Sequence, residues 1–400
     1  MPESSARPTT SGTDVTATPA PARAGRLPAL DVLRGIAILG TLGTNIWILT
    51  NPEGLIGYLE GRGDPSGAPG WTEAVLQQLA QGKFLGLLTI MFGIGLAIQQ
   101  RSAVRGGRAW PGSYPVRAGL LLLDGLLNFL FIAEFDVLMG YAVTGAVVAY
   151  VLATRERAQR RGLLIAAGIH VAMLTLIAAA MALAPPSGSG DPQPLDPNPY
   201  ADGSFWDLVV FRLENVGLFR LEPLFVVPMS IALFLLGANL FRAGLFEPAG
   251  RGLRRRLMVL GFAIAAPLDL VLGVWNGDLV LFTRYGLAPL VALGILALVA
   301  EFYVERTRTG FTGRRFSEVG RMALSCYILQ NLVASALCYG WGLGLAAQVS
   351  PGARVPFTVA IYLTVCAIML TFAHLWLRRF DRGPVEWLWH SSYRALTRSS

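Results

Sequence analysis

The sequence predicts an all-α, polytopic membrane bundle of about ten transmembrane helices with both termini in the cytoplasm. Apolar residues make up 54% of the 400 residues and charged residues only 14%, whereas roughly a quarter of a soluble domain is charged. With a mean hydropathy of +0.52, the chain lacks the charge to cover the surfaces of soluble domains. Lipid is therefore the expected solvent of its apolar faces.

Ten stretches have the length and composition of a membrane span, which needs roughly 17–25 mainly apolar residues. Pro and Gly inside several of them are compatible with spanning, because neighbouring helices satisfy the freed backbone groups. A short turn at 134–136 separates the third stretch from the fourth. The predicted spans are 30–50, 84–100, 116–134, 136–153, 162–184, 223–242, 256–275, 279–302, 322–346 and 355–377.

The basic residues orient these spans. Of the 33 Lys and Arg residues, 26 lie in the two tails and in every second loop. Because cytoplasmic loops hold the excess of Lys and Arg, the tails and these loops are predicted to be cytoplasmic. A missed or an invented span would destroy this alternation. The opposite side has only Arg62, Lys83, Arg212, Arg220, Arg284 and Arg354.

The sequence divides into a membrane-embedded domain, 26–393, and two cytoplasmic tails. The first tail, 1–25, is rich in Ser, Thr, Pro and Ala, which predicts disorder without a signal peptide. The second tail is 394–400. The acidic outer loop, 185–222, begins irregularly, and its second half, 205–220, alternates apolar with charged residues. That alternation predicts an amphipathic helix on the outer surface.

The sequence indicates no nucleic acid, metal or bound cofactor. The net charge of +8 comes from arginines between apolar stretches, which is a feature of membrane topology. The three cysteines lie inside apolar stretches without metal-ligand spacing, so buried free thiols are expected. They are Cys326, Cys338 and Cys366.

The first span has a polar stripe. Asp31 and Arg34 are three residues apart and lie on one helix face. Asn45 follows Arg34 by eleven residues, so it shares that face about 16 Å further along. The stripe either binds a substrate or fixes helix packing through an Asp–Arg pair and an interhelical hydrogen bond of the Asn.

Two other groups of polar residues are candidates for binding. Charged and phenolic residues near the outer ends of several spans could converge in an outward-facing cleft, or they could be ordinary solvated turns. A polar face on the ninth span could line a cavity or bond other helices. The first group is Lys83, Glu134, Asp136, Glu222, Arg284 and Tyr285, and the second includes Tyr327, Gln330 and Asn331.

Five segments resemble the YeiB-like family, which is catalogued as a domain of unknown function. Their order along the chain is that of the family. The resemblance implies a multi-pass protein of the bacterial inner (plasma) membrane. The segments are LDVLRGIAILGTLGTNI (30–46), KFLGLLTIMFGIGL (83–96), FDVLMGYAVTG (135–145), GRMALSCYILQNLVASALCYGWGLGL (320–345) and LRRFDRGPVEWLWHSSY (377–393).

This family is in turn similar to transmembrane acyltransferases such as the lysosomal heparan-α-glucosaminide N-acetyltransferase. The shared pattern is Asp, Arg-Gly and Asn in the first span, matched here by Asp31, Arg34, Gly35 and Asn45. The resemblance implies acyl transfer, with the Asn acting on the side opposite the cytoplasm. The present sequence has Asn128 where many YeiB-like proteins have His.

Acyl transfer is the first functional hypothesis. Acyl-CoA, the donor substrate, would bind the cytoplasmic arginines through its phosphates. Asn45 would hold the acyl carbonyl or the acceptor, and Glu134 or Asp136 would be the general base. Arg284 and Lys83 would stabilise the developing negative charge.

Two alternatives remain open. The first is a transporter or channel for a small, perhaps anionic, solute that binds at Arg284. The second is a scaffold without turnover, whose basic loops bind anionic lipid heads. The expected partners are membrane lipid and a small-molecule substrate, and general symmetry preference favours a homodimer.

Overall fold

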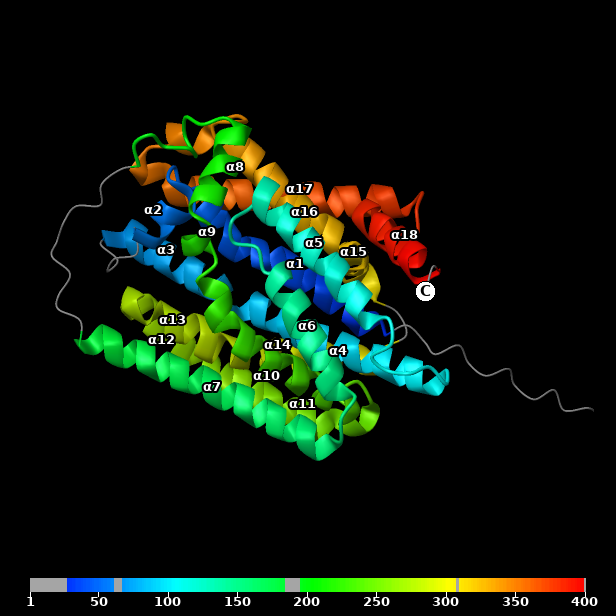
Figure 1. The fold of residues 1–400 in the computed structure, drawn as a ribbon. Coiled ribbons are helices and arrows are strands. Elements are labelled where there is room, and N and C mark those ends of the chain that lie inside the picture. The colour runs from blue at the N-terminus through cyan, green and yellow to red at the C-terminus, as the bar shows by residue number, and fades with distance from the viewer. Residues whose placement is uncertain (1–26, 61–66, 184–194, 307–308, 399–400) are drawn as a thin grey trace, which may run out of the picture.

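The computed structural model describes residues 27–60, 67–183, 195–306 and 309–398, and every regular element in them is a helix (Figure 1). The expected disordered tail, 1–25, lies outside the described residues. The final segment, 394–400, was expected to be a tail, but α18 (Pro384–Arg398) includes most of it.

All ten predicted spans coincide with helical segments. Two of them contain π-helical turns, at Val259–Ala265 and Thr283–Leu287. The corresponding helices are α1 (Pro28–Leu49), α4 (Lys83–Arg105), α5 (Tyr114–Phe131), α6 (Leu138–Leu152), α7 (Glu156–Leu183), α10 (Glu222–Arg242), α11 and α12 (Arg251–Met258 and Ala266–Trp275), α13 and α14 (Val280–Phe282 and Ala288–Val304), α16 (Ala323–Cys338) and α17 (Arg354–Leu377).

Within the described residues, seven helical segments are long and apolar enough to cross a membrane. An eighth results if α15 (Gly310–Arg321) and α16 count as one span bent by 87°. Two further apolar helices, Leu138–Leu152 and Val226–Arg242, are shorter. The chain is therefore a membrane protein with several spanning helices, and the crossing by all ten segments stays a prediction.

The structure corrects two predicted helices and adds others. The ninth span ends at Cys338 rather than 346, because three glycines follow and Gly344 adopts a φ of +61°. The amphipathic helix breaks at Asn215 into α8 (Phe205–Glu214) and α9 (Val216–Phe219). Helices α2 (Gly54–Glu60) and α3 (Gly67–Ala80) occupy the connection before α4, which the sequence analysis had left without helices.

Helix α1 lies at the centre of the bundle and packs against α4, α14, α15, α16 and α17. Glycines permit the closest approaches, as is common between membrane helices. A Cβ at Gly35 would lie 2.0 Å from the carbonyl oxygen of Phe316, and one at Gly320 would lie 1.8 Å from that of Asp31. Helices α4 and α10 approach in the same way at Gly93, where a Cβ would lie 2.0 Å from the oxygen of Phe234.

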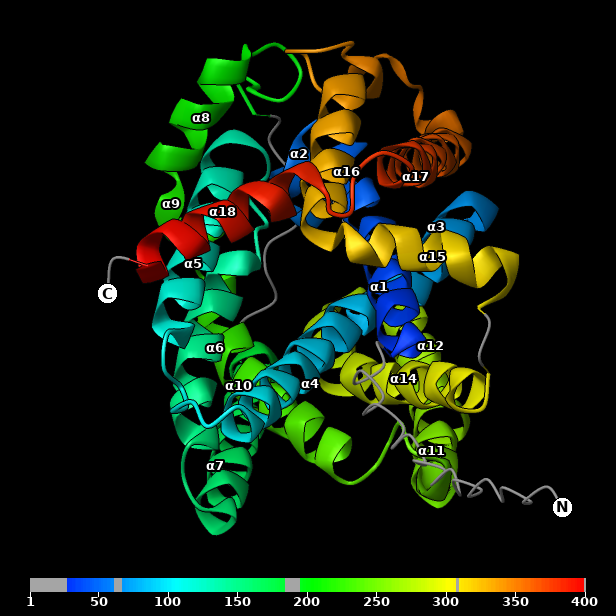
Figure 2. The same ribbon diagram turned by 90° about the vertical axis from the view of Figure 1, so that its right-hand side faces the viewer.

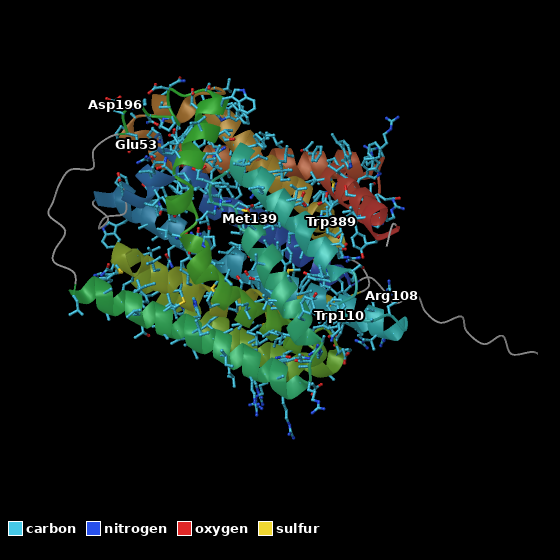
Figure 3. All side chains as sticks on the ribbon, in the orientation of Figure 1. Glu53, Arg108, Trp110, Met139, Asp196 and Trp389 are labelled. Atoms are coloured by element: carbon cyan, nitrogen blue, oxygen red, sulfur yellow. The ribbon has the colours of Figure 1, made fainter. Side chains whose placement is uncertain are left out.

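The two ends of the bundle differ in charge. The start of α1, the end of α4 and α18 lie at one end, and α15 and α18 run across it (Figure 2). We call this the arginine end, since it includes Arg108. Glu53 and Asp196 lie at the opposite, acidic end (Figure 3). Helices α8 and α9 run transverse to the long helices beside α5 (Figure 1).

The first and last described residues lie at the same end of the bundle (Figure 1), and the predicted topology can be tested there. Reporters fused to the N-terminus and to the C-terminus should both report the cytoplasm, because an even number of crossings returns the chain to its starting side and arginine sidedness orients it. Paired alkaline phosphatase and fluorescent protein fusions provide the measurement. Opposite locations of the two fusions would rule out the ten-span topology.

Candidate functional site

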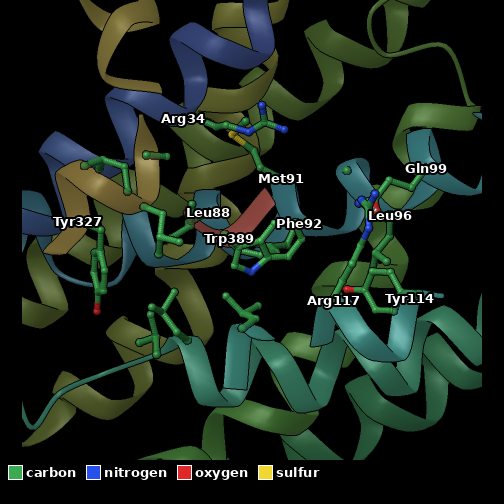
Figure 4. Close-up of a pocket in the computed structure, with 17 residues that line it drawn as sticks. Arg34, Leu88, Met91, Phe92, Leu96, Gln99, Tyr114, Arg117, Tyr327 and Trp389 are labelled. Atoms are coloured by element: carbon green, nitrogen blue, oxygen red, sulfur yellow. Dashed lines mark hydrogen bonds between the residues drawn. The ribbon is translucent and has the colours of Figure 1, made fainter. Parts of the chain in front are cut away.

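A cavity of about 280 Å³ opens among helices near the arginine end. We call it the wide cavity (Figure 4). Apolar side chains form most of its wall, and its polar groups gather towards the ends of α4 and α5 that lie at the arginine end. The lining residues are Arg34, Ile38, Leu88, Met91, Phe92, Gly95, Leu96, Gln99, Tyr114, Arg117, Leu121, Val137, Leu138, Ala323, Leu324, Tyr327 and Trp389.

Arg117 is held in place at this cavity. Its Nη1 donates to Oε1 of Gln99 at 2.6 Å. Its guanidinium lies 4.6 Å from the ring centre of Tyr393 and 5.9 Å from that of Trp389, and those two rings stack at 5.8 Å. These contacts combine a hydrogen bond with cation–π attraction, so the positive charge is fixed beside the cavity.

Other arginines lie near the same place. Burial and the guanidinium groups of Arg382, Arg394 and Arg117 lower the pKa of His390 in α18. Several positive charges therefore surround one face of α18. Such a cluster favours an anionic ligand, because guanidinium groups pair well with phosphate and carboxylate.

Helix α18 is fastened over the cavity through Glu386. The Glu386 carboxylate accepts the backbone N–H groups of Leu324 at 2.8 Å and Ser325 at 3.1 Å, and it also accepts the Ser325 hydroxyl. These donors belong to the first turn of α16, where an anion is stabilising. Trp389, one turn after Glu386, is thereby held in the cavity wall.

A second, smaller cavity of about 30 Å³ lies further along α1, towards the acidic end. We call it the narrow cavity. Val137 and Tyr327 line both cavities, so the two are separated by a waist formed by these residues. The narrow cavity is lined by Thr41, Thr44, Asn45, Ile48, Gly82, Leu85, Phe135, Val137, Arg284 and Tyr327.

The predicted polar stripe of α1 follows this pair of cavities. Arg34 lines the wide cavity and Asn45 lines the narrow one. Asp31 is buried and pairs with Arg34 at 3.4 Å without lining either cavity. The stripe thus has both suggested features: an Asp–Arg pair and polar groups that line a cavity.

The polar face of α16 lies behind Asn45. The Asn45 Nδ2 donates to Oδ1 of Asn331 at a long 3.5 Å. The Asn331 Nδ2 and both amide atoms of Gln330 are buried without a hydrogen-bond partner. Buried polar groups are normally paired, so these amides mark a place where water or a ligand would be stabilised.

The two candidate bases occupy different environments. Glu134 accepts from Nε of Arg212 at 3.2 Å and from the Tyr200 hydroxyl at 2.9 Å. Its carboxylate is fully buried and already paired. In the same loop, the carbonyl oxygens of 134 and 136 accept from Arg220.

Among the described residues, no salt bridge reaches the Asp136 carboxylate, although the Arg220 charge acts on it and lowers its pKa. It accepts from Nδ2 of Asn128 at 2.9 Å and from the backbone N–H of Met139 at 3.1 Å. Burial raises the pKa of Asp136 to about 6, and these two hydrogen bonds partly oppose the effect. The group lies beside Val137 of the waist and interacts electrostatically with the Tyr327 phenol.

The remaining candidates fall into two clusters. Arg284, in the π-helical turn, pairs with Glu222 at 3.0 Å, and Glu222 also accepts the Tyr285 hydroxyl. The Nε of Arg284 is buried without a partner. Lys83 instead pairs with Asp269, which is completely buried. Lys83 lines neither cavity, so the predicted outer cluster is divided among separate ion pairs.

Sequence reasoning missed several residues of the site. Asp269 could have been found, because an acidic residue inside the predicted span 256–275 requires a partner. Gln99, Arg117 and Trp389 were not among the candidate site residues, because nothing in their sequence neighbourhood shows that they meet at one cavity. Within the part of the chain that the structure describes, no group of three or more His, Cys, Asp or Glu could hold a metal ion.

The fold and the two neighbouring cavities define a helical membrane protein with a cavity among its helices. The family described as "Protein of unknown function (DUF418)" matches residues 240–395. The uncharacterized protein YxaH of Bacillus subtilis is 30% identical over 392 residues, which is 92% of this chain and 94% of YxaH. The uncharacterized protein YeiB of Escherichia coli is 28% identical over 384 residues, covering 90% and 94%.

The chain therefore belongs to the YeiB-like, DUF418 family. This agrees with the resemblance found in the sequence. No solved structure matches the chain.

Replacement of Glu134 by Gln should destabilise the protein. The substitution leaves Arg212 buried without its counter-charge, and breaking a buried pair costs about 3–5 kcal/mol. A lower thermal unfolding midpoint of the purified protein in detergent would be the measured effect. Glu214→Gln, an exposed position on α8, is the matched control and should leave the midpoint unchanged. Equal midpoints for the two variants would contradict a structural role of Glu134.

Proposed function

We propose that the protein is a transmembrane acyltransferase that moves an acyl group from cytoplasmic acyl-CoA to an acceptor on the outer side. The observation that supports this most is that the two cavities lie on either side of the same two residues, Val137 and Tyr327. A donor entering from the arginine end and an acceptor entering from the acidic end would meet there. Since YxaH and YeiB are bacterial proteins, we place it in the bacterial inner membrane.

The donor side suits an anionic carrier. The phosphates of acyl-CoA would bind the arginines around α18, among them Arg117, Arg382 and Arg394. The wide cavity would receive the arm that ends in the thioester. Its apolar wall excludes water, which strengthens electrostatic interactions at the reacting carbonyl.

The reaction would take place at the waist. The acceptor hydroxyl or amine, bound beside Asn45, attacks the thioester carbonyl carbon and forms the new C–O or C–N bond. The C–S bond breaks, and its electron pair leaves on the CoA sulfur. The acceptor proton passes through the Tyr327 hydroxyl to Asp136, and Asp136 then returns this proton to the departing CoA thiolate, which regenerates the ionised base. We assign the base to Asp136 because Glu134 is neutralised by Arg212.

The developing oxyanion needs donors at the same place. The Asn45 amide and the Arg284 guanidinium both line the narrow cavity. The unpartnered Nε of Arg284 gives it a free donor even while Nη2 is bound to Glu222. Donors fixed in advance are worth about 3–4 kcal/mol each in comparable sites. Lys83, paired with Asp269, takes no part in this scheme.

A transporter of a small anionic solute is the second candidate. The end-to-end order of the cavities, with Arg284 in the narrow one, would also suit a permeation path. In proteoliposomes, acyl transfer without solute flux would support the enzyme. Flux that depends on Arg284, without transfer from any acyl-CoA, would favour the transporter.

Replacement of Asn45 by Leu should lower the rate of acyl transfer from radiolabelled acyl-CoA by at least about a hundredfold. Leu has a similar size but cannot donate to the carbonyl oxygen. Thr364→Ala, which removes an exposed hydroxyl on α17, should retain full activity. An assay with purified protein and outer-membrane or periplasmic acceptors provides the measurement. Full transfer by the Asn45 variant would exclude this residue from the chemistry.

The transfer rate should rise with pH through about 6. Only the ionised carboxylate of Asp136 accepts a proton, and its raised pKa lies at about 6. Between about pH 5 and about pH 7 the ionised fraction, and with it the rate, increases about tenfold. Asp136→Asn should remove this rise of the rate with pH, together with most of the activity. Asp207→Asn, on the exposed face of α8, should change neither. An unaltered pH profile in Asp136→Asn would assign the base to another group.

A further inference from the structure

We propose that the wide cavity holds an aliphatic acyl chain of several carbons, so that the donor is a medium-chain acyl thioester. The inference rests on the proposed function and adds the class of donor. It depends on the chemistry of the cavity wall, on one glycine that leaves empty space in that wall, and on the charge at its mouth.

The wall of the cavity is apolar on three sides. Along α4, Leu88, Met91, Phe92 and Leu96 recur at helical spacing and face the cavity. Helices α5, α6 and α16 add Leu121, Leu138 and Leu324. An acetyl group would leave most of this surface without contacts, whereas each buried methylene contributes about 0.8 kcal/mol.

Gly95 marks unfilled space in this wall. A Cβ at Gly95 would meet no atom within 4 Å, although the residue lines the cavity. Two residues earlier, a Cβ at Gly93 would lie 2.0 Å from the backbone of Phe234. Packing therefore accounts for Gly93 but not for Gly95. The missing side chain at Gly95 leaves room for a ligand.

The shape and charge of the wide cavity suit a single acyl chain that is attached to an anionic carrier. Leu88 and Gln99 are eleven residues apart on α4, so the cavity extends over about 16 Å. Its volume of about 280 Å³ lies just below the range of about 300–1,000 Å³ for small-molecule pockets. That size suits a single chain rather than a two-chain lipid. Arg117, beside Gln99 and Tyr114 (Figure 4), places a positive charge at the end where the carrier would enter.

The test measures binding to the full-length protein in lipid nanodiscs. The probes are CoA, acetyl-CoA, octanoyl-CoA and palmitoyl-CoA. Octanoyl-CoA should bind at least about tenfold more tightly than acetyl-CoA, since several methylenes leave water. Gly95→Leu should reduce this ratio to about one, because its side chain fills the cavity.

Two further variants separate cavity filling from misfolding. Gly119→Leu, on the exposed side of α5 where a Cβ also meets no atom, should preserve the tenfold ratio. Met91→Ala, which enlarges the cavity, should shift the preference from octanoyl-CoA towards palmitoyl-CoA. This opposite shift cannot result from a loss of folded protein.

The outcomes distinguish this inference from the proposed function. Equal affinities of the wild-type protein for acetyl-CoA and octanoyl-CoA would overturn the medium-chain donor and leave acyl transfer standing. Chain-length preference that Gly95→Leu and Met91→Ala leave unaltered would place the chain elsewhere and overturn the inference. Failure of every CoA thioester to bind would overturn the proposed function and this inference together.

Discussion

The close contact between α1 and α4 organises the site. A Cβ at Gly40 would lie 2.1 Å from the ring of Phe84, so only glycine lets this ring pack against α1. Helix α4 begins at Lys83, one residue before Phe84, so nearly its whole length lies on one side of this contact. The wide cavity is lined by Arg34 of α1 and Leu88 of α4, and the narrow cavity by Asn45 further along α1. Val137 and Tyr327 line both cavities, so they mark the boundary between the two.

The ion pairs inside the bundle explain which polar groups remain available for chemistry. An uncompensated charge at membrane depth is costly, and buried pairs fix geometry rather than add much stability. Glu134 binds Arg212, Lys83 binds Asp269, and Arg254 binds Glu301. With these charges neutralised, the polar groups with unused hydrogen-bonding capacity include the amides of Gln330 and Asn331. They lie on the same helix as Tyr327.

The sequence predicted the helices well because each span is a local, composition-driven element. It failed where the determining interaction joins distant residues. The Glu134–Arg212 pair links positions 78 residues apart, and nothing near Glu134 in the sequence indicates that its charge is neutralised. Asp136, two residues later, has the same local context but a different partner. Only the tertiary structure separates the structural acid from the candidate base, and the same applies to Gly93 and Gly95 on α4.

The bend between α15 and α16 shows a related limit of prediction from sequence. Apolar length identified α16 as a span, but its 87° bend from α15 places α15 across the arginine end (Figure 2). Hydropathy contains no information on that bend. The cap of Glu386 on the first turn of α16 then fixes α18 beside the same bend, so that Trp389 reaches the cavity wall.

In the proposed function, the arginines of this end would both orient the chain in the membrane and bind the donor. An excess of Lys and Arg keeps a segment on the cytoplasmic side during insertion, and the folded protein gathers several of them around α18. The phosphates of a cytoplasmic acyl-CoA would bind these side chains through charge-assisted hydrogen bonds. In the proposed function, the charge that orients the chain in the membrane would thus also orient the donor. The thioester would enter the wide cavity from the cytoplasm, and the acceptor would approach from the acidic end.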